Sequence, residues 1–388
     1  MKESGWMVLD GFTSLAEIKE LILDIKGKMR VKILAGMDYE EDGRTKDGVI
    51  PEAAAVLLTS LHVDALGIVC RSEKTRKEIV EKYMKWSPLP LALGEKCGEK
   101  THYSTEMWRK DEGIYRKDFK KRSVVCSSSK VVEISGIRTI GDRINPTGKP
   151  KLQQELRAWN MNGVIELARS QVEAGVDILD MNVHIPDVSE KELMTEAVYA
   201  VQRSVDAPIQ IDSVNRQAVE AALKACDGKP IVNSVNGTKE AMETLLPMVY
   251  KYGAAMIGMT IDESGVPMEA EKRYQIAERI VKSAENYGIE KEDIFIDCLV
   301  LPVSTEKANV RESLKAAKMI REGLGVHTVL GIGNISYGMA QRSVLDKTFL
   351  TLALEHGVCL PMINPAVPEM METVACFRLF NGMERMRE

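Results

Sequence analysis

Hydrophobic and polar residues alternate along the chain in a way that predicts two kinds of element in regular succession. From Val124 onward, short apolar runs alternate with longer segments in which apolar residues recur at helical spacing. We expect eight strands, at residues 138–141, 177–181, 208–211, 230–232, 254–259, 294–296, 327–332 and 359–363. Several intervening helical segments end at a glycine, as is typical of helix carboxyl ends: Gly175, Gly253, Gly288, Gly325 and Gly357.

Eight strand–helix units predict a (β/α)8 TIM barrel over residues 123–388. An open doubly wound sheet is disfavoured, because no Gly-x-Gly-x-x-Gly fingerprint follows the first strand at Gly141. Residues 1–122 show fewer units, with helices at 15–26, 51–61 and 74–85 and strands at 31–35, 65–69 and 89–93. We expect a partial β/α barrel there, followed by a charged linker or ordered strap at 99–122 that contains Tyr103, Trp108 and Tyr115.

The composition of the 388-residue chain argues against several classes of protein. Hydrophobic residues make up 45% and the formal net charge is -5, so we expect no nucleic-acid partner. No apolar stretch reaches the roughly 18 residues that a membrane helix needs, and the first residues lack the apolar core of a signal peptide. We therefore expect a cytoplasmic protein without a membrane partner. Seven scattered cysteines and five dispersed histidines predict reduced thiols and no metal site.

Polar residues lie at or just after the ends of most of the predicted strands, at Asp142, Asp180, Asp212, Asn233, Asp297 and Asn334. Because the carboxyl ends of barrel strands meet at one mouth, these side chains are expected to share a site. Carboxylates only accept hydrogen bonds whereas carboxamides also donate, so the set matches a fused heterocycle such as the edge of a pterin. The aspartates could instead bind a hard cation, but the lack of histidine and the presence of asparagines in the same set favour an organic ligand. Any single Asp or Asn after a strand could also be only a helix N-cap.

Longer motifs surround these positions, in the segments 125–129, 141–149, 177–183, 231–237 and 331–336. Together they resemble the folate-binding barrel of cobalamin-dependent methionine synthase and of methyltetrahydrofolate:corrinoid protein methyltransferases, relatives of dihydropteroate synthase. The resemblance implies that Asp212, Asn233 and Asp297 hold the pterin ring. It also implies that Asn334 is catalytic and approaches N5, the atom that bears the methyl group. The remaining members of the expected pterin-binding set are Asn145, Asn182, Gly331 and Gly333.

The function that the resemblance implies is transfer of a methyl group between N5 of methyltetrahydrofolate and the cobalt of a corrinoid, with proton delivery to N5. Methyltetrahydrofolate or tetrahydrofolate is then the substrate, and a separate protein carries the cobalamin or other corrinoid. A homodimer is the expected assembly. The chain departs from the family at Asp142, His184, Cys298 and Gly333, where Glu, Gly, Pro and Ser are usual.

Two alternatives to methyl transfer stay open. The first is a non-catalytic folate-binding or scaffold subunit of a methyl-transfer complex, since binding residues survive in proteins that have lost turnover. The second, ranked lower, is a dihydropteroate synthase, because we find no late basic motif for the leaving pyrophosphate.

Residues 1–122 resemble the later part of the homocysteine-binding barrel that precedes the folate barrel in methionine synthase. Gly67-Ile68-Val69-Cys70 stands where that module has Gly-x-Asn-Cys, and the Gly-Gly-Cys-Cys motif of the module is missing. A tetrahedral zinc ion needs several ligands brought together, and this part offers only Cys70 of the expected set. We therefore expect a scaffold or oligomer role for it, and no homocysteine methylation.

Overall fold

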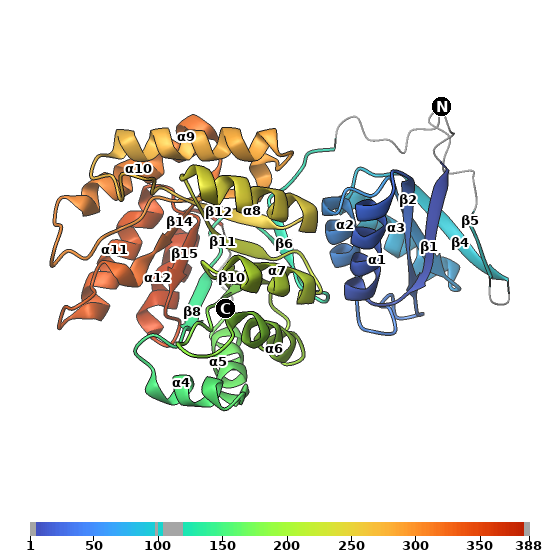
Figure 1. Cartoon of the computed structure of the whole chain (residues 1–388), viewed down its shortest axis with the longest axis horizontal. Coiled ribbons are helices and arrows are strands. Elements are labelled where there is room, and N and C mark those ends of the chain that lie inside the picture. Colours follow the sequence, from blue (N-terminus) through green and yellow to red (C-terminus); the bar gives the residue numbers. More distant parts are fainter. Residues whose placement is uncertain (1–4, 98–99, 104–118, 384–388) are drawn as a thin grey trace.

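A closed barrel of eight parallel strands forms the larger part of the chain in the computed structural model, which describes residues 5–97, 100–103 and 119–383 (Figure 1). The strands are β8 (Ile140–Ile144), β9 (Ile178–Met181), β10 (Ile209–Asp212), β11 (Ile231–Asn236), β12 (Ala255–Met259), β13 (Ile294–Asp297), β14 (His327–Gly331) and β15 (Leu360–Ile363). They are hydrogen-bonded in chain order, and β15 closes the ring onto β8. The predicted TIM barrel is confirmed.

Helices cover the outside of the barrel, one or two after each strand (Figure 1). They are α4 (Pro150–Arg157), α5 (Asn162–Glu173), α6 (Glu190–Gln202), α7 (Arg216–Ala225), α8 (Lys239–Tyr252), α9 (Ala270–Asn286), α10 (Asn309–Leu324), α11 (Arg342–Glu355) and α12 (Pro368–Phe380). Their apolar faces pack on the strands in one continuous core. The helices α8 and α10 end at Gly253 and Gly325, whose φ angles of 62° and 69° are left-handed, so glycine is suited to both positions.

Several barrel strands differ from the predicted boundaries near the polar positions. The strand β8 was expected to end at Gly141 but runs to Ile144, so Asp142 lies within it. The strand β11 was expected to end at Val232, but it continues to Asn236 because Asn236 still pairs with Met259 of β12. A register shift between Asn233 and Val235 accommodates this extension. The strand β14 stops at Gly331 rather than at residue 332, and Ile332–Asn334 forms a 3-10 turn. Asn233 therefore lies within a strand, whereas Asn334 lies on a turn.

The N-terminal residues form a separate sheet of five strands in the order β1 (Trp6–Phe12), β2 (Lys32–Tyr39), β3 (Ala65–Cys70), β4 (Leu91–Cys97), β5 (Lys100–Tyr103). The helices α1 (Leu15–Lys28), α2 (Pro51–Ser60) and α3 (Glu73–Trp86) pack on it. Three of the strands were expected, and the half-barrel character of this part is confirmed. The expectation missed β1, and it wrongly placed residues 100–103 in a linker, since β5 pairs antiparallel with β4. The rest of the expected strap, including Trp108 and Tyr115, lies outside the described residues.

An antiparallel pair of short strands, β6 (Val124–Cys126) and β7 (Val131–Glu133), closes one end of the barrel. Val125 and Val132 pack in the interior against the amino-terminal halves of the strands, for example against Ile140. The backbone N–H of Cys126 donates to the carbonyl oxygen of Lys229, just before β11. This end is the base of the barrel, opposite the mouth where the polar strand ends lie.

The N-terminal sheet and its three helices, called the N-terminal unit below, pack against the same base of the barrel. The ammonium group of Lys19, on α1, is fully buried and donates to the carbonyl oxygens of Leu223, at 2.8 Å, and of Cys226, at the end of α7. Burial lowers the pKa of Lys19. A cation at a helix carboxyl terminus is favourable, because it complements the exposed carbonyl groups and the dipole of the helix.

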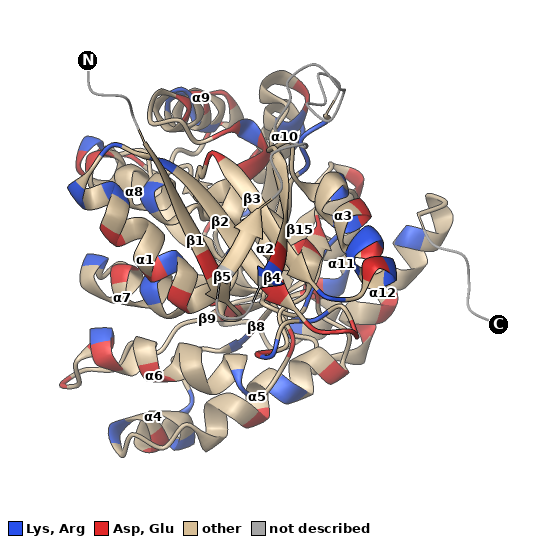
Figure 2. Ribbon diagram, turned by 90° about the vertical axis from the view of Figure 1, so that its right-hand side faces the viewer, with Lys and Arg blue, Asp and Glu red and all other residues tan. Residues whose placement is uncertain are grey.

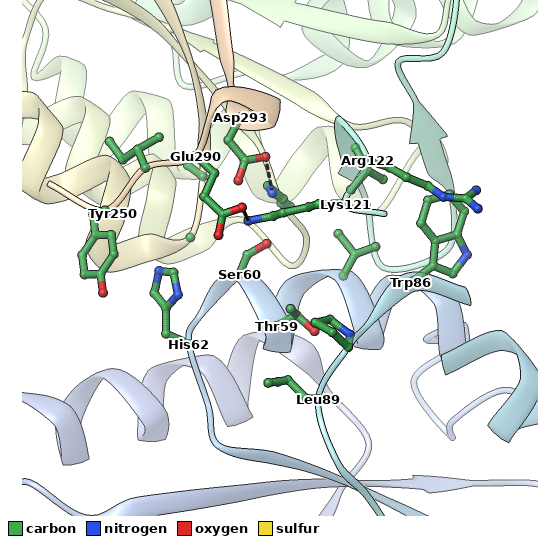
Figure 3. A pocket seen from close by; sticks show the side chains of 18 of the residues that line it. Thr59, Ser60, His62, Trp86, Leu89, Lys121, Arg122, Tyr250, Glu290 and Asp293 are labelled. Atoms are coloured by element: carbon green, nitrogen blue, oxygen red, sulfur yellow. Dashed lines mark hydrogen bonds and ion pairs between the residues drawn. The ribbon is translucent and has the colours of Figure 1, made fainter. Parts of the chain in front are cut away.

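A cavity of about 340 Å³ also lies in this interface, between α2 and the loops at the base of the barrel (Figure 3). Lys229 contacts Asp293 at 2.6 Å and Lys121 contacts Glu290 at 2.5 Å, while His62 stacks on Tyr250 with ring centroids 4.4 Å apart. The two lysines that line the cavity are thus each paired with an acid. The cavity is far from the polar strand ends, so it is not the candidate site.

Residues of both charge signs are interspersed along the helices, as the colours of the ribbon in Figure 2 show. The N-terminal strands in this view are largely uncharged (Figure 2). None of the helices within the described ranges is long and apolar enough to span a membrane.

Candidate active site

Three barrel strands bring the expected pterin-binding residues to one mouth. Asp212 is the last residue of β10, Asp297 is the last residue of β13, and Asn233 lies in β11. Asp212 and Asn233 are direct partners in the parallel register of β10 and β11. Because the strands are parallel and closed into a ring, all three positions lie at the carboxyl end of the barrel. Whether they bind a pterin stays a prediction.

Asp297 is almost fully buried, with 4% of its surface exposed. Its Oδ1 atom accepts a hydrogen bond of 2.7 Å from the backbone N–H of Leu299, which fixes the orientation of the carboxyl group. Burial raises the pKa of Asp297 to about 6, although the Leu299 N–H and the nearby Arg273 guanidinium lower it. The buried Arg273 donates to the carbonyl oxygens of Cys298 and Leu299 and so holds the loop behind this carboxyl group.

The neighbouring strands β9 and β10 carry a linked set of acids and amides. The side-chain amide of Asn182 donates to Oδ2 of Asp212 at 3.2 Å. One step deeper in the barrel, Nε2 of Gln210 donates to Oδ1 of Asp180 at 2.5 Å. Gln210 is fully buried, Asp180 is 5% exposed and Asp212 is half-buried. The interior of the barrel below the mouth is therefore polar rather than a plain apolar core.

Burial disfavours the ionised form of each acid in this set. It raises the pKa of Asp180 well above the ordinary value, and the negative charge of Asp212 raises it further. Burial also raises the pKa of Asp212, against the hydrogen bond from Asn182. The pKa of Asp142, in β8, is raised by burial as well, and its Oδ1 atom has no hydrogen-bond partner among the described residues.

Asn334 lies at the rim, on the 3-10 turn after β14, and its side chain is exposed. A Cβ atom at Gly331 would come within 2.7 Å of the Asn334 Nδ2 atom, so glycine lets the amide lie against the end of β14. A Cβ atom at Gly333 would meet only the Arg342 guanidinium at 3.6 Å, an ordinary contact. The two glycines therefore differ: Gly331 makes room for Asn334, whereas the space at Gly333 would admit a larger residue.

Asn145 and Asn182 both use their side-chain oxygen in a local turn. Oδ1 of Asn145 accepts from the N–H of Thr147 at 2.9 Å, and Oδ1 of Asn182 accepts from the N–H of His184 at 3.0 Å. The amide of Asn182 faces Asp212, so this residue also belongs to the polar set. For Asn145 the structure supplies a turn-forming role at the mouth, and its part in pterin binding stays a prediction.

Sequence reasoning gave no role to Glu190, which the structure places near Asp212, or to Gln210, which it places beside Asp180. The carboxyl group of Glu190, at the start of α6, is buried and accepts from the hydroxyl of Ser213 at 2.5 Å. Its other oxygen lies 3.1 Å from Nδ1 of His184. Gln210 was seen only as part of a strand end. The one available signal was the spacing of Asp180 with Asn182 and of Gln210 with Asp212, which places each pair on the same face of its strand.

The cysteines and acids offer no obvious metal site in the described ranges. No group of three or more His, Cys, Asp or Glu side chains is arranged to hold an ion there. Cys298, beside Asp297, is fully buried, and burial raises the pKa of its thiol. It is thus a packed residue rather than a nucleophile.

Comparison with known proteins places this geometry in a family. Residues 141–363 match the family described as pterin binding enzyme. The chain is 26% identical to a methylcorrinoid:tetrahydrofolate methyltransferase of Eubacterium limosum over 253 residues, which are 64% of this chain and 92% of that protein. It is 28% identical to the methionine synthase of Mycobacterium tuberculosis over 261 residues, 62% of this chain, and so spans only 22% of that relative.

A solved structure shows the same fold. A dihydropteroate synthase of Xanthomonas albilineans, in complex with indole-2-carboxylic acid and 6-chloroguanine, superimposes with a TM-score of 0.55 at 16% identity, covering 68% of this chain and 99% of that one. At this level of identity the likeness concerns the fold alone. With the family match spanning more than half of the sequence, and with relatives that are methyltransferases, the chain belongs to the pterin binding enzyme family.

Proposed function

We propose that the protein transfers a methyl group between N5 of methyltetrahydrofolate and the cobalt of a corrinoid carried by a separate protein. One observation carries the proposal: Asp212, Asn233, Asp297 and Asn334 converge on the mouth of a barrel whose family binds pterins. The names of the relatives support a folate and a corrinoid as the two reactants. The cytoplasmic location expected from the sequence stays a prediction.

The polar set at the mouth fits the edge of a pterin. The buried carboxylate of Asp297 and that of Asp212 accept hydrogen bonds from ring N–H and amino groups, and Asn233 supplies both a donor and an acceptor. A buried acceptor that meets its ligand donor contributes more than an exposed one, because water does not compete. Together these contacts hold the pterin in one orientation and leave the methyl group accessible from the mouth.

Methyl transfer from the folate breaks a carbon–nitrogen bond, and the electron pair of that bond returns to N5 together with a proton. The corrinoid supplies a cobalt nucleophile for the methyl carbon. The Asn334 oxygen accepts a hydrogen bond from the protonated N5 and stabilises its positive charge, but a neutral carboxamide is no proton source. Asp180 fits that role, because burial and the charge of Asp212 raise its pKa and so favour its protonated form.

The rim of the mouth carries exposed apolar side chains that suit a docking partner. Val214, directly after Ser213, is fully exposed, and Tyr337 and Met339, which follow Asn334, are 69% and 37% exposed. The N-terminal unit lies at the opposite end, where Lys19 contacts the base, so it leaves this rim accessible. We propose that the corrinoid protein docks here.

The expected homodimer is also part of the proposal. The adjacent helices α11 and α12 expose Val344, Leu352, Leu379 and Phe380, with Phe380 81% exposed. Exposed large apolar side chains on two neighbouring helices are typical of a protein interface. A second copy of this chain would cover them in an isologous contact.

The two alternative functions predict different experimental results. A scaffold subunit would bind folate without transfer, and a dihydropteroate synthase would act on a pterin pyrophosphate. The deciding experiment mixes the purified protein with methyltetrahydrofolate and reduced cobalamin, or with methylcobalamin and tetrahydrofolate, and follows the cobalt spectrum. Transfer in either direction supports the proposal, whereas folate binding without transfer supports the scaffold alternative. Calorimetry with Asp212→Ala tests the binding residue, and unchanged folate affinity would remove it from the site.

A further inference from the structure

Carboxamides and carboxylates are paired in two successive layers between β9 and β10. Gln210 stands opposite Asp180 in the register of the two strands, and its Nε2 atom donates to Asp180 Oδ1 at 2.5 Å. One layer nearer the mouth the direction is reversed, because Asn182, directly after β9, donates to Asp212 on β10 at 3.2 Å. Each side of this pair thus contributes one acid and one amide, and each acid receives an amide N–H from the opposite side.

Gln210 differs from Asn182 in one respect that packing does not explain. Its Oε1 atom is buried and has no hydrogen-bond partner within the described ranges. The other neighbour of its amide nitrogen is the Sδ atom of Met362, on β15, at 3.3 Å. A buried amide oxygen without a donor is unfavourable, so an apolar residue of similar size would be easier to place here.

The groups around Asp180 indicate what the Gln210 Oε1 atom could do as a hydrogen-bond acceptor. Asp142 approaches from β8, Asp212 and Gln210 from β10, and Asn233 hydrogen-bonds to it from β11. Burial and the charge of Asp212 raise the pKa of Asp180 and so favour its protonated form. An ionised carboxylate needs a donor, and a protonated carboxyl group needs an acceptor for its O–H. The Gln210 carboxamide offers either one, because a half-turn of the amide exchanges Nε2 and Oε1.

We infer that Gln210 is a positioning residue that keeps Asp180 hydrogen-bonded both when it is ionised and when it is protonated. Asp180 then gains or loses its proton in place, without a shift of β9. The inference rests on the proposed function for the destination of that proton, which is N5 of the folate.

The first test uses the folate-free protein, so that it does not depend on the proposed reaction. Infrared difference spectra over a pH series follow the protonated carboxyl signal that Asp180→Asn removes. In Gln210→Met the midpoint of this signal moves upward by about one to two pH units, because the ionised carboxylate loses a charge-assisted hydrogen bond. In the control Gln202→Met, which removes the hydrogen bonds of Gln202 to Ala225 and Asp227 at the base, the midpoint stays in place.

The second test is the pH profile of single-turnover methyl transfer from methyltetrahydrofolate to reduced cobalamin. In Gln210→Met, the pH at which the transfer rate falls on the alkaline side shifts by the same amount and in the same direction as the midpoint of the infrared carboxyl signal. An unchanged midpoint in Gln210→Met, or an equal shift in Gln202→Met, would overturn the inference. If the parent protein transfers no methyl group, the proposed function fails while the infrared test still decides the role of Gln210.

Gln210→Glu keeps the size of the side chain and serves where the Met variant does not fold. A second acid beside Asp180 should split its titration into two steps, because two neighbouring buried carboxyl groups do not ionise together. One step at the parental midpoint would contradict the contact between these two side chains.

Discussion

Replacement of Asp297 by Asn distinguishes two effects of this carboxyl group. One is the stability that is lost by burying it, and the other is its contribution to ligand binding. The side chain is 4% exposed and its pKa in the folded protein is about 6, raised by burial from an ordinary 3.8. A carboxyl group whose pKa is raised by folding favours the folded state when it is protonated. Its contribution to the free energy of unfolding is complete below the unfolded pKa and is lost as the pH rises through the folded pKa. The window for Asp297 therefore runs from about pH 4 to about pH 6.

The magnitude follows from the shift. Two pKa units at 1.36 kcal/mol each amount to about 3 kcal/mol of stability that the parent protein lacks at pH 8. Asparagine does not titrate, and its side-chain oxygen can still accept from the Leu299 N–H that now bonds to Asp297. Asp297→Asn should therefore become more stable relative to the parent as the pH rises. The difference between their free energies of unfolding should change by about 3 kcal/mol, in the direction that favours the variant, between pH 4 and pH 8. In a chain of this size that corresponds to roughly 4 °C in Tm.

Thermal unfolding over a pH series measures the gap, and calorimetry with methyltetrahydrofolate measures binding. The variant should bind folate roughly 5- to 150-fold more weakly at pH 8, since its NH2 group faces ligand donors. Affinity of the parent should fall below pH 6, as Asp297 becomes protonated. Asp262 is the control of opposite sign, because hydrogen bonds from the Ser264 N–H and Arg279 lower its pKa. A stability gap that does not depend on pH would refute the reasoning for Asp297.

Three further predictions concern other parts of the chain. Asn334→Ala should lower single-turnover methyl transfer by roughly ten- to a thousandfold while folate affinity falls less, because N5 carries a proton, and so donates a hydrogen bond to the Asn334 oxygen, only during the transfer step; transfer at the parental rate with saturating folate would reduce Asn334 to a turn residue. Phe380→Glu should convert a dimer to a monomer in light scattering, since it places a charge in an apolar contact; a monomeric parent would contradict the dimer. Metal analysis should find no stoichiometric zinc, and zinc that disappears in Cys70→Ala would overturn the scaffold role of the N-terminal unit.

The sequence by itself determined the barrel and its polar mouth. The succession of apolar runs and helical segments is local, and glycines such as Gly253 and Gly325 terminate the helices where the left-handed φ angle requires them. Each polar residue at the end of a strand could be assigned to the mouth, because all strands of such a barrel run in the same direction. Asp212, Asn233 and Asp297 were found in this way, and they do lie at one end of the barrel.

Only the tertiary structure decided how strands pair and where the N-terminal unit lies. The contact between Gln210 and Asp180 depends on the register of β10 against β9, and no local pattern fixes a register across about 30 residues of intervening chain. The strands β1 and β5 lie at or near the edges of their sheet, where one-sided burial leaves a weak alternation of polar and apolar residues. The position of Lys19 on the base of the barrel rests on a hydrogen bond to Leu223, more than 200 residues further along the chain, which only folding brings together.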